Sequence, residues 1–258
     1  MNLKPNTGAI IMAFTSVKYL QMALICALEL IRLNPYLKAR IVTDFETLPP
    51  TFINFLAKQN IEIYIQKSNF KTPFENRNVK TRPDLFSPFQ TTIYMDADIL
   101  PVSDMLDLFE FNTDENAIYM VKEKKSKINT IGELKTDDGI ETIKVYGNEN
   151  YHIYNSGLVM FNKSKKTDDL FQIWHQEWLK FKVRDQLPLV RAIVKTGIKV
   201  IEIPGKFNFF LDRLWDEKPE NITNLHIRGF YTIWEKTLDI YREKCPESFE
   251  IVNKILPF

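Results

Sequence analysis

The sequence predicts an α/β protein in which helices cover both faces of a mostly parallel, twisted β-sheet. Short apolar runs rich in Ile, Val and Tyr alternate with longer amphipathic segments between residues 8 and 203. This alternation is typical of βαβ units, in which a helix joins consecutive parallel strands. The chain has 258 residues and shows no internal repeat and no linker, which favours one domain spanning residues 1–258.

Each element follows from a local pattern. Strands are expected where β-branched and aromatic residues run together, at residues 8–14, 39–43, 61–65, 91–95, 117–121, 154–161 and 199–203. Helices are expected at residues 20–33, 50–59, 168–181 and 186–195, with a helical tail at the C-terminus. Pro83 and Pro88 leave room for only a short helix between them. The polar residues 122–150 are predicted to form a mobile insertion with a hairpin at 141–146.

Composition excludes several classes of protein. The net charge of +1 provides no overall field that would attract nucleic acid or an anionic membrane. No apolar run approaches the roughly 20 residues that a transmembrane helix needs, and the apolar segment 8–14 is too short for a signal peptide. The two cysteines, Cys26 and Cys245, do not make a disulfide framework, and we expect Cys26 to be a buried free thiol. A cytoplasmic location is therefore predicted, and the oligomeric state stays open.

The most informative motif is a pair of aspartates at the end of the strand at 91–95. Asp96 and Asp98 follow the apolar run Ile93-Tyr94-Met95, so their carboxylates are expected at the carboxyl edge of the sheet. Hard divalent cations bind such oxygens, usually together with substrate phosphates. This motif indicates a nucleotide-activated substrate.

Three later segments carry polar groups suited to the same kind of site. Asn155-Ser156-Gly157 opens a strand and offers an amide, a hydroxyl and close backbone approach to sugar hydroxyls. Asp185-Gln186 starts a helix, where Asp185 is either a simple helix cap or a sugar ligand. His226 would add an imidazole to the two carboxylates, which favours Mn²⁺ or a similar transition metal over Ca²⁺.

In this order and spacing, Met95-Asp96-Ala97-Asp98, Asn155-Ser156-Gly157, Asp185-Gln186 and His226-Ile227-Arg228-Gly229 resemble the motifs of the GT-A-fold retaining glycosyltransferases. That family includes glycogenin and bacterial lipopolysaccharide galactosyltransferases. The resemblance covers about residues 8–235 and implies a single GT-A-type domain with a Rossmann-like nucleotide-binding half. The halves would be residues 8–110 for the nucleotide-sugar and 151–235 for the sugar and acceptor, followed by a tail at 236–258.

The resemblance also implies roles for individual residues. Asp96, Asp98 and His226 would be Mn²⁺ ligands, with Mg²⁺ as the alternative ion. The donor-binding set would comprise Thr15, Ser16, Tyr19, Lys80, Ala97, Asp98, Asn155, Ser156 and Gly229, with Tyr19 stacking on the uracil and Arg82 as a nearby substitute for Lys80. The catalytic and sugar-recognition set would comprise Asn155, Asp185 and Gln186. One departure stands out: Thr232 occupies the place of a family lysine that clamps the diphosphate, a role that Arg228 or Lys236 would have to fill.

The resulting hypothesis is a metal-dependent glycosyltransferase that moves a hexose from a UDP-sugar to a hydroxyl acceptor with retention. The acceptor class stays open among a glycan, a lipid-linked sugar, a protein side chain and a modified DNA base. Lys122, Lys124, Lys125 and Lys127 would contact the backbone phosphates of a DNA acceptor. A degenerate fold that binds nucleotide-sugar without turnover is the non-enzyme alternative. Nucleotidyl transfer is disfavoured because Ala13-Phe14-Thr15-Ser16 offers no Gly-rich phosphate loop.

Overall fold

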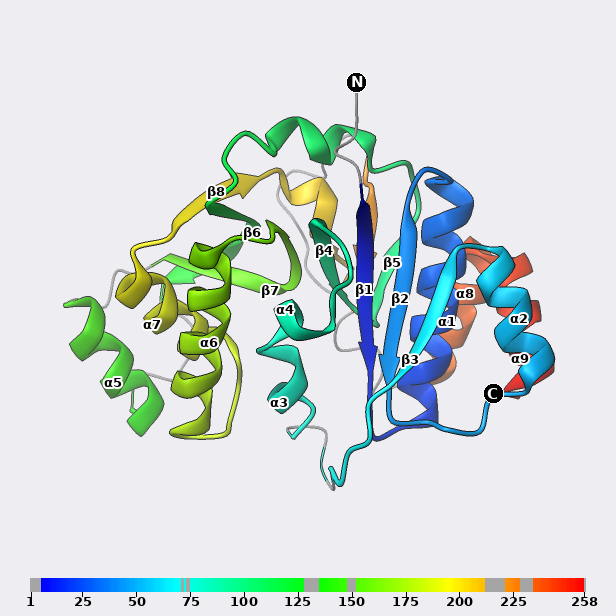
Figure 1. Ribbon diagram of the computed structural model, residues 1–258, viewed down its shortest axis with the longest axis horizontal. Helices are drawn as coiled ribbons and strands as arrows, with labels where there is room; N and C mark the ends of the chain where they lie inside the picture. The colour runs from blue at the N-terminus through cyan, green and yellow to red at the C-terminus, as the bar shows by residue number, and fades with distance from the viewer. Residues whose placement is uncertain are drawn as a thin grey trace.

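The computed structural model describes residues 6–70, 72, 75–127, 135–147, 152–211, 221–227 and 234–257. Its centre is a seven-stranded sheet with the strand order β3-β2-β1-β4-β7-β6-β8 (Figure 1). These strands are β1 (Thr7–Ala13), β2 (Lys38–Thr43), β3 (Ile61–Ile65), β4 (Thr91–Asp96), β6 (Ala117–Lys127), β7 (His152–Asn162) and β8 (Lys199–Ile203). Only β7 runs antiparallel to its neighbours, so the predicted mostly parallel sheet is confirmed.

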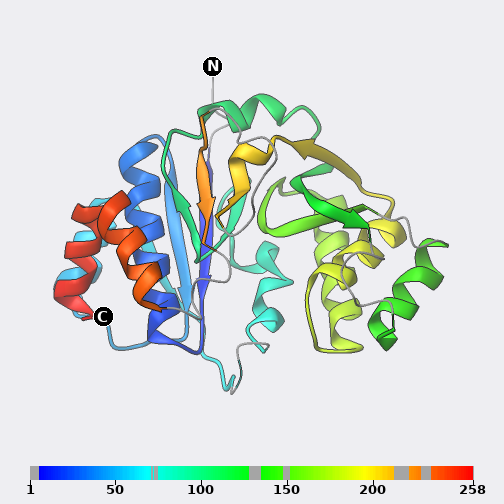
Figure 2. The same ribbon diagram turned by 180° about the vertical axis from the view of Figure 1, so that it is seen from behind.

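Helices cover both faces of this sheet, as the alternating pattern predicts. The helices are α1 (Val17–Leu33), α2 (Pro50–Lys58), α3 (Arg77–Lys80), α4 (Pro83–Phe86), α5 (Asp137–Tyr146), α6 (Lys165–Leu179), α7 (Gln186–Thr196), α8 (Trp234–Lys244) and α9 (Pro246–Ile255). Successive side chains of β1 point to opposite faces, so Ala9 and Ile11 pack with α1, α8 and α9 while Ile10 packs with α6 and α7. The two groups of helices are seen on either side of the sheet in Figures 1 and 2.

A small second sheet lies beside the end of β4. It has the order β5-β10-β9 and consists of β5 (Ile99–Pro101), β9 (Phe209–Phe210) and β10 (Asn224–His226). β10 pairs antiparallel with β5, which places His226 opposite Ile99, one residue after the second aspartate of the motif. This pairing brings a residue from the end of the chain to the carboxyl edge of the main sheet. Nothing in the local sequence patterns predicts it.

The expected hairpin at 141–146 is wrong, because these residues lie in helix α5. Thr136 caps the start of this helix through a hydrogen bond from the Gly139 N–H, and Gly147 ends it in the left-handed conformation with a φ of 89°. β6 also continues to Lys127, into the segment expected to be an insertion. Residues 128–134 and 148–151 of that segment lie outside the described residues.

A buried ion network holds α5 against α6 and α7. The guanidinium of Arg191 is fully buried and pairs with Glu177 at 2.8 Å and with Asp138 at 2.6 Å. Burial alone would raise the pKa of Glu177, but hydrogen bonds from Lys195, Lys180 and Arg191 outweigh it and lower this pKa to about 2. The network explains why these residues form a helix, since Arg191 bonds both the side chain and the carbonyl of Asp138.

The structure also shows the state of the two cysteines and the character of the helices. Cys26 and Cys245 are both buried free thiols. Among the helices of the described residues, none combines the length and apolar character that a bilayer span requires.

Candidate active site

A cavity of about 450 Å³ opens at the carboxyl ends of β1 and β4. The elements that line it are β1, β4, β7, β10, α1, α3 and the turn that leads into α7. Its lining residues are Met12, Phe14, Tyr19, Asn76, Arg77, Lys80, Tyr94, Asp96, Ala97, Asp98, Asn155, Ser156, Gly157, Arg184, Asp185, Gln186 and His226. The carboxyl edge of a parallel sheet is where open α/β proteins usually bind ligands.

Two carboxylates and an imidazole converge in this cavity. Each of Asp96, Asp98 and His226 offers one ligand atom, and these atoms lie within 4.8 Å of one another. The geometry follows from chain pairing: Asp96 ends β4, and the Ile227 N–H donates to the Asp98 carbonyl at 2.8 Å, which holds β10 beside the motif. Burial alone would raise the pKa of Asp98, but the charge of a protonated His226, followed by that of Lys80, outweighs burial and lowers this pKa below its usual value.

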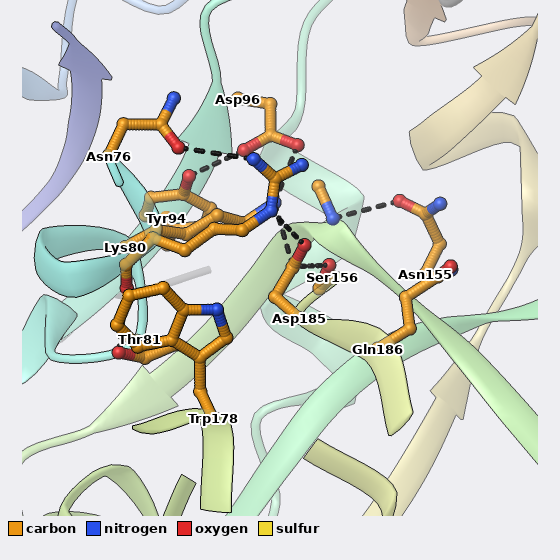
Figure 3. Close-up of polar contacts among 12 residues, drawn as sticks. Asn76, Lys80, Thr81, Tyr94, Asp96, Asn155, Ser156, Trp178, Asp185 and Gln186 are labelled. Carbon is orange, nitrogen blue, oxygen red and sulfur yellow. Dashed lines mark hydrogen bonds and ion pairs between the residues drawn. The ribbon is translucent and has the colours of Figure 1, made fainter. Parts of the chain in front are cut away.

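Two cations face the carboxylates from α3. Lys80 extends between Asp96 and Asp185, with Nζ 2.9 Å and 3.1 Å from their respective Oδ2 atoms (Figure 3). Arg77 Nε lies 3.1 Å from Oδ1 of Asp185, and the Ser156 hydroxyl donates to its Oδ2 at 2.5 Å. Burial alone would raise the pKa of Asp185, but Lys80 and Arg77 hold it well below its usual range. Asp185 is therefore a buried carboxylate whose ionised form is stabilised by its neighbours.

Each carboxylate oxygen of the first aspartate of the motif accepts one hydrogen bond from a protein group. The Tyr94 hydroxyl donates to Oδ1 of Asp96 at 2.5 Å, and Lys80 donates to Oδ2. Burial, followed by the charge of Asp96, raises the pKa of Tyr94 well above its ordinary value, so this hydroxyl stays a donor. Asp96 is thus held in one orientation from both sides.

Amide side chains complete the far wall of the cavity. The Asn155 and Gln186 side-chain amides both donate to Oε1 of the buried Glu123, at 2.9 Å and 3.1 Å. Asn155 also accepts a bond from the Gly157 N–H at 2.8 Å (Figure 3 shows Asn155 and Gln186 side by side). Gly157 is needed here because a Cβ at this position would stand 2.8 Å from the Asn155 Oδ1.

The structure brings most of the expected site residues together. Ten of them line the cavity: Tyr19, Lys80, Asp96, Ala97, Asp98, Asn155, Ser156, Asp185, Gln186 and His226. Asp185 stands at the start of α7 but makes no side-chain cap bond, so the simple helix-cap interpretation is wrong. Its bonds to Ser156, Lys80 and Arg77 take the place of capping.

Other expected residues lie apart from the cavity lining. Ser16 caps α1 by accepting a bond from the Lys18 N–H. Arg82 points to Asp84, with Nη2 2.8 Å from Oδ2. Thr15 adopts a φ of 71°, and its buried hydroxyl has no partner among the described residues. Arg228, Gly229 and Thr232, together with the side chains of Lys124, Lys125 and Lys127, lie outside the described part of the structure.

Several cavity residues escaped the sequence analysis. These are Met12, Phe14, Asn76, Arg77, Tyr94 and Arg184, together with Glu123 and Asn208 behind the wall. Arg77 had a usable signal, because it lies three residues before Lys80 on the same helical face. Asn208 had none, since only the fold brings it against Asn155.

Comparison with known proteins identifies the family. The profile of Glycosyl transferase family 8 matches residues 10–229. The chain belongs to glycosyl transferase family 8. This membership confirms the resemblance read from the four motifs and the expectation that the chain is a glycosyltransferase. Among curated proteins, none matches the sequence significantly.

Solved structures of other glycosyltransferases share the fold of this family 8 chain. The galactosyltransferase LgtC, solved with donor and acceptor sugar analogs, has a TM-score of 0.60 at 14% identity over 95% of this chain and 99% of its own. The bifunctional glycosyltransferase WbbM has a TM-score of 0.62 at 14% identity over 98% of this chain. GlyE of Streptococcus pneumoniae has a TM-score of 0.59 at 15% identity over 96% of this chain. The chain spans about half the length of WbbM, 52%, and 63% of GlyE.

Proposed function

We propose that this family 8 glycosyltransferase transfers a hexose from a UDP-sugar to a hydroxyl acceptor, with a divalent metal ion and with retention at the anomeric carbon. The observation that carries the proposal is the convergence of Asp96, Asp98 and His226 within 4.8 Å in the 450 Å³ cavity. The same cavity is also lined by charged groups suited to phosphates, such as Lys80, and by polar groups suited to sugar hydroxyls, such as Asn155.

The cluster fits a small divalent cation. Two carboxylate oxygens and one imidazole nitrogen make a mixed oxygen and nitrogen donor set, which suits Mn²⁺ better than Ca²⁺, with Mg²⁺ as the alternative. An ion held there would supply charge neutralisation for the leaving UDP. Asp96 and Asp98 with His226 would hold it.

Different residues of the cavity would bind different parts of the UDP-sugar donor. Tyr19 and Met12 are half-buried lining residues that give the cavity an apolar surface, and Tyr19 would stack on the uracil base. Lys80 and Arg77 place two positive charges on the cavity lining beside Asp96 and Asp185, and these charges would bind the diphosphate. Because both cations also contact Asp185, a diphosphate bound to them would bring its attached sugar close to that carboxylate.

Asp185 is suited to the sugar end of the site. Its depressed pKa keeps it ionised, so it accepts hydrogen bonds from sugar hydroxyls and stabilises positive charge at the anomeric carbon. Asn155, Ser156 and Gln186 orient the sugar from the same side. In the reaction the bond from the anomeric carbon to UDP breaks, the acceptor oxygen bonds to that carbon, and the proton of the acceptor hydroxyl passes to a phosphate oxygen of the departing UDP.

The test is release of UDP from a panel of UDP-sugars, measured with Mn²⁺ and with EDTA and with water as the default acceptor. We expect release from one sugar that depends on Mn²⁺ and stops in EDTA. A parallel thermal melt should show that UDP with Mn²⁺ raises the melting temperature. A folded protein that neither releases UDP nor gains stability from UDP with Mn²⁺ would rule out a UDP-sugar donor.

A further inference from the structure

A buried chain of amide hydrogen bonds ends on the imidazole of His226. Asn208, in the 3-10 helix η3 (Gly205–Asn208), donates its Nδ2 to the Oδ1 of Asn155 at 2.7 Å. The Oδ1 of Asn208 lies 2.8 Å from Nδ1 of His226. The three residues are at most 4% exposed, so the bonds among them are shielded from bulk solvent.

The donor and acceptor in each of these hydrogen bonds are fixed by the groups that Asn155 contacts, the Gly157 N–H and the Glu123 carboxylate. The backbone N–H of Gly157 is only a donor, so the Asn155 atom that it meets at 2.8 Å is the amide oxygen. The other end of the Asn155 amide faces the Glu123 carboxylate at 2.9 Å, which is an acceptor and requires the NH₂ group there. Both ends therefore give the same orientation of the Asn155 amide.

The same logic carries through Asn208 to the histidine. The Asn155 oxygen needs a donor, so Asn208 turns its NH₂ group to Asn155 and its oxygen to His226. An oxygen against Nδ1 requires a proton on Nδ1, and a neutral imidazole then has a bare lone pair on Nε2. Nε2 is the nitrogen that faces Asp98, at 3.5 Å from its Oδ1.

Two acceptors facing each other across this gap leave room for a cation. Nε2 without a proton and the Asp98 carboxylate repel one another, unless a positive charge lies between them. The ring has little freedom to escape this arrangement, because Phe210 stacks on it with a centroid separation of 4.6 Å. Gly157 also lies close to the ring, since a Cβ there would stand 2.9 Å from the His226 Cε1.

We propose that Asn155 and Asn208 are positioning residues that set the tautomer of His226, so that Nε2 is available to a metal ion before the ion arrives. The proposal rests on the proposed metal-dependent function only for the identity of the ion. Metal-ligating histidines generally donate their other ring N–H to a partner that fixes the ring, and loss of that partner costs 10–100-fold in metal affinity. Here the backbone N–H of Gly157 would fix the orientation of the Asn155 amide, and through Asn208 the tautomer of His226.

The first experiment reads the tautomer without any metal. The chain has three histidines, so ¹⁵N-histidine labelling gives a spectrum simple enough to assign with a His226→Gln variant. At a pH where the ring is neutral, we expect the proton on Nδ1 in the wild-type protein. A neutral His226 that carries its proton on Nε2 would overturn the proposal, whatever the enzyme does with substrate.

Variants then distinguish the effect of the His226 tautomer on Mn²⁺ binding from the effect of disturbed packing. Asn208→Leu removes the acceptor and should shift the proton toward Nε2 and weaken Mn²⁺ binding by about 10–100-fold in calorimetry. Asn208→Asp keeps an acceptor against Nδ1, so the Nδ1–H tautomer and most of the Mn²⁺ affinity should return. Asn162→Leu is the matched control, because Asn162 is a buried amide at the opposite end of β7 that bonds Thr91 and Asn112.

The outcomes distinguish the two proposals. Nδ1–H in the wild type with no UDP release from any donor would leave the positioning role standing and contradict the proposed function. Mn²⁺-dependent UDP release with the proton on Nε2 would do the reverse. An equal loss of Mn²⁺ affinity in Asn208→Leu and Asn162→Leu would mean that general destabilisation, rather than the tautomer, accounts for the effect and would overturn the positioning role.

Discussion

Gly157→Ala is the substitution that should damage the site most while changing the chain least. Gly157 lies inside β7, and its φ is outside the left-handed region, so alanine brings no backbone strain. A Cβ at this position would stand 2.8 Å from the Asn155 Oδ1, 2.9 Å from the His226 Cε1 and 3.1 Å from the Asp96 Oδ2. One methyl group thus presses on two of the proposed metal ligands, Asp96 and His226, and on the Asn155 amide, which orients His226 through Asn208.

The size of the effect follows from those distances. Ordinary contact begins at 3.4 Å, so the three atoms would have to retreat by about 0.3 to 0.6 Å. None retreats freely, because Asn155 is held by Glu123 and Asn208, and Phe210 stacks on His226. A site of this kind tolerates about 0.5 Å of misplacement, and 1 Å costs on the order of 100-fold in rate. We expect a loss of about 10–100-fold in Mn²⁺ affinity and in Mn²⁺-dependent UDP release.

The assays are Mn²⁺ calorimetry, UDP release and a urea titration on the same preparation. Overpacking should cost no more than about 1–3 kcal/mol of unfolding free energy, so the variant should fold. Gly8→Ala is the contrasting variant: its Cβ would meet the Lys38 carbonyl at 2.7 Å and the Phe89 ring at 2.6 Å, at the end of β1 away from the cavity. It should lower stability and keep activity per folded molecule. Wild-type Mn²⁺ affinity and turnover in Gly157→Ala would refute the reasoning.

Other perturbations act on the metal cluster or on the buried ion network. Asp98→Asn should abolish Mn²⁺-dependent UDP release and leave the circular dichroism spectrum unchanged; full activity would contradict the assignment of Asp98 to the metal. Arg191→Leu takes the ion-pair partner from the buried Asp138 carboxylate and one of three cations from Glu177, so urea titration should show a loss of about 3–5 kcal/mol, whereas Lys165→Ala, which breaks an exposed pair, should cost no more than about 0.5 kcal/mol. Because the folded pKa of Glu177 is lowered from 4.5 to about 2, its ion pairs stabilise the fold fully above about pH 4.5, and this stabilisation is lost as the pH falls toward 2. Urea midpoints between pH 2 and pH 5 should therefore fall more steeply in the wild type than in Glu177→Gln, and parallel curves would argue against the shift.

Local patterns predicted the sheet well because they depend on neighbouring residues alone. The strand expected at residues 61–65 is β3 with both ends correct, and the one expected at 199–203 is β8. The paired aspartates were placed correctly for the same reason, since an apolar run that ends in carboxylates has one natural place in an α/β fold, the carboxyl edge of the sheet. Buried strands and their exits are local features, and the sequence displays them directly.

The error at residues 141–146 shows where local patterns stop. Ile, Thr and Val in this segment favour a strand by propensity. The Thr136 cap and the bonds from Arg191 to Asp138 and Thr142 favour the helix instead. Arg191 is 53 residues away from Asp138 along the chain, so the deciding interaction is absent from any local window.

Local sequence patterns likewise point to the proposed metal ligands but not to the residues that orient them. The sequence suggests His226 as a metal ligand because its motif resembles the family's and because imidazole suits a transition metal, a property that belongs to the residue itself. Whether Nδ1 or Nε2 of that ring is free depends on Asn208, Asn155 and the Gly157 N–H, which β10, η3 and β7 bring together. The requirement is for an acceptor against Nδ1 rather than for asparagine as such. A related chain that lacks Asn208 could keep the same ligand nitrogen only by presenting a carboxylate or a backbone carbonyl at the same place.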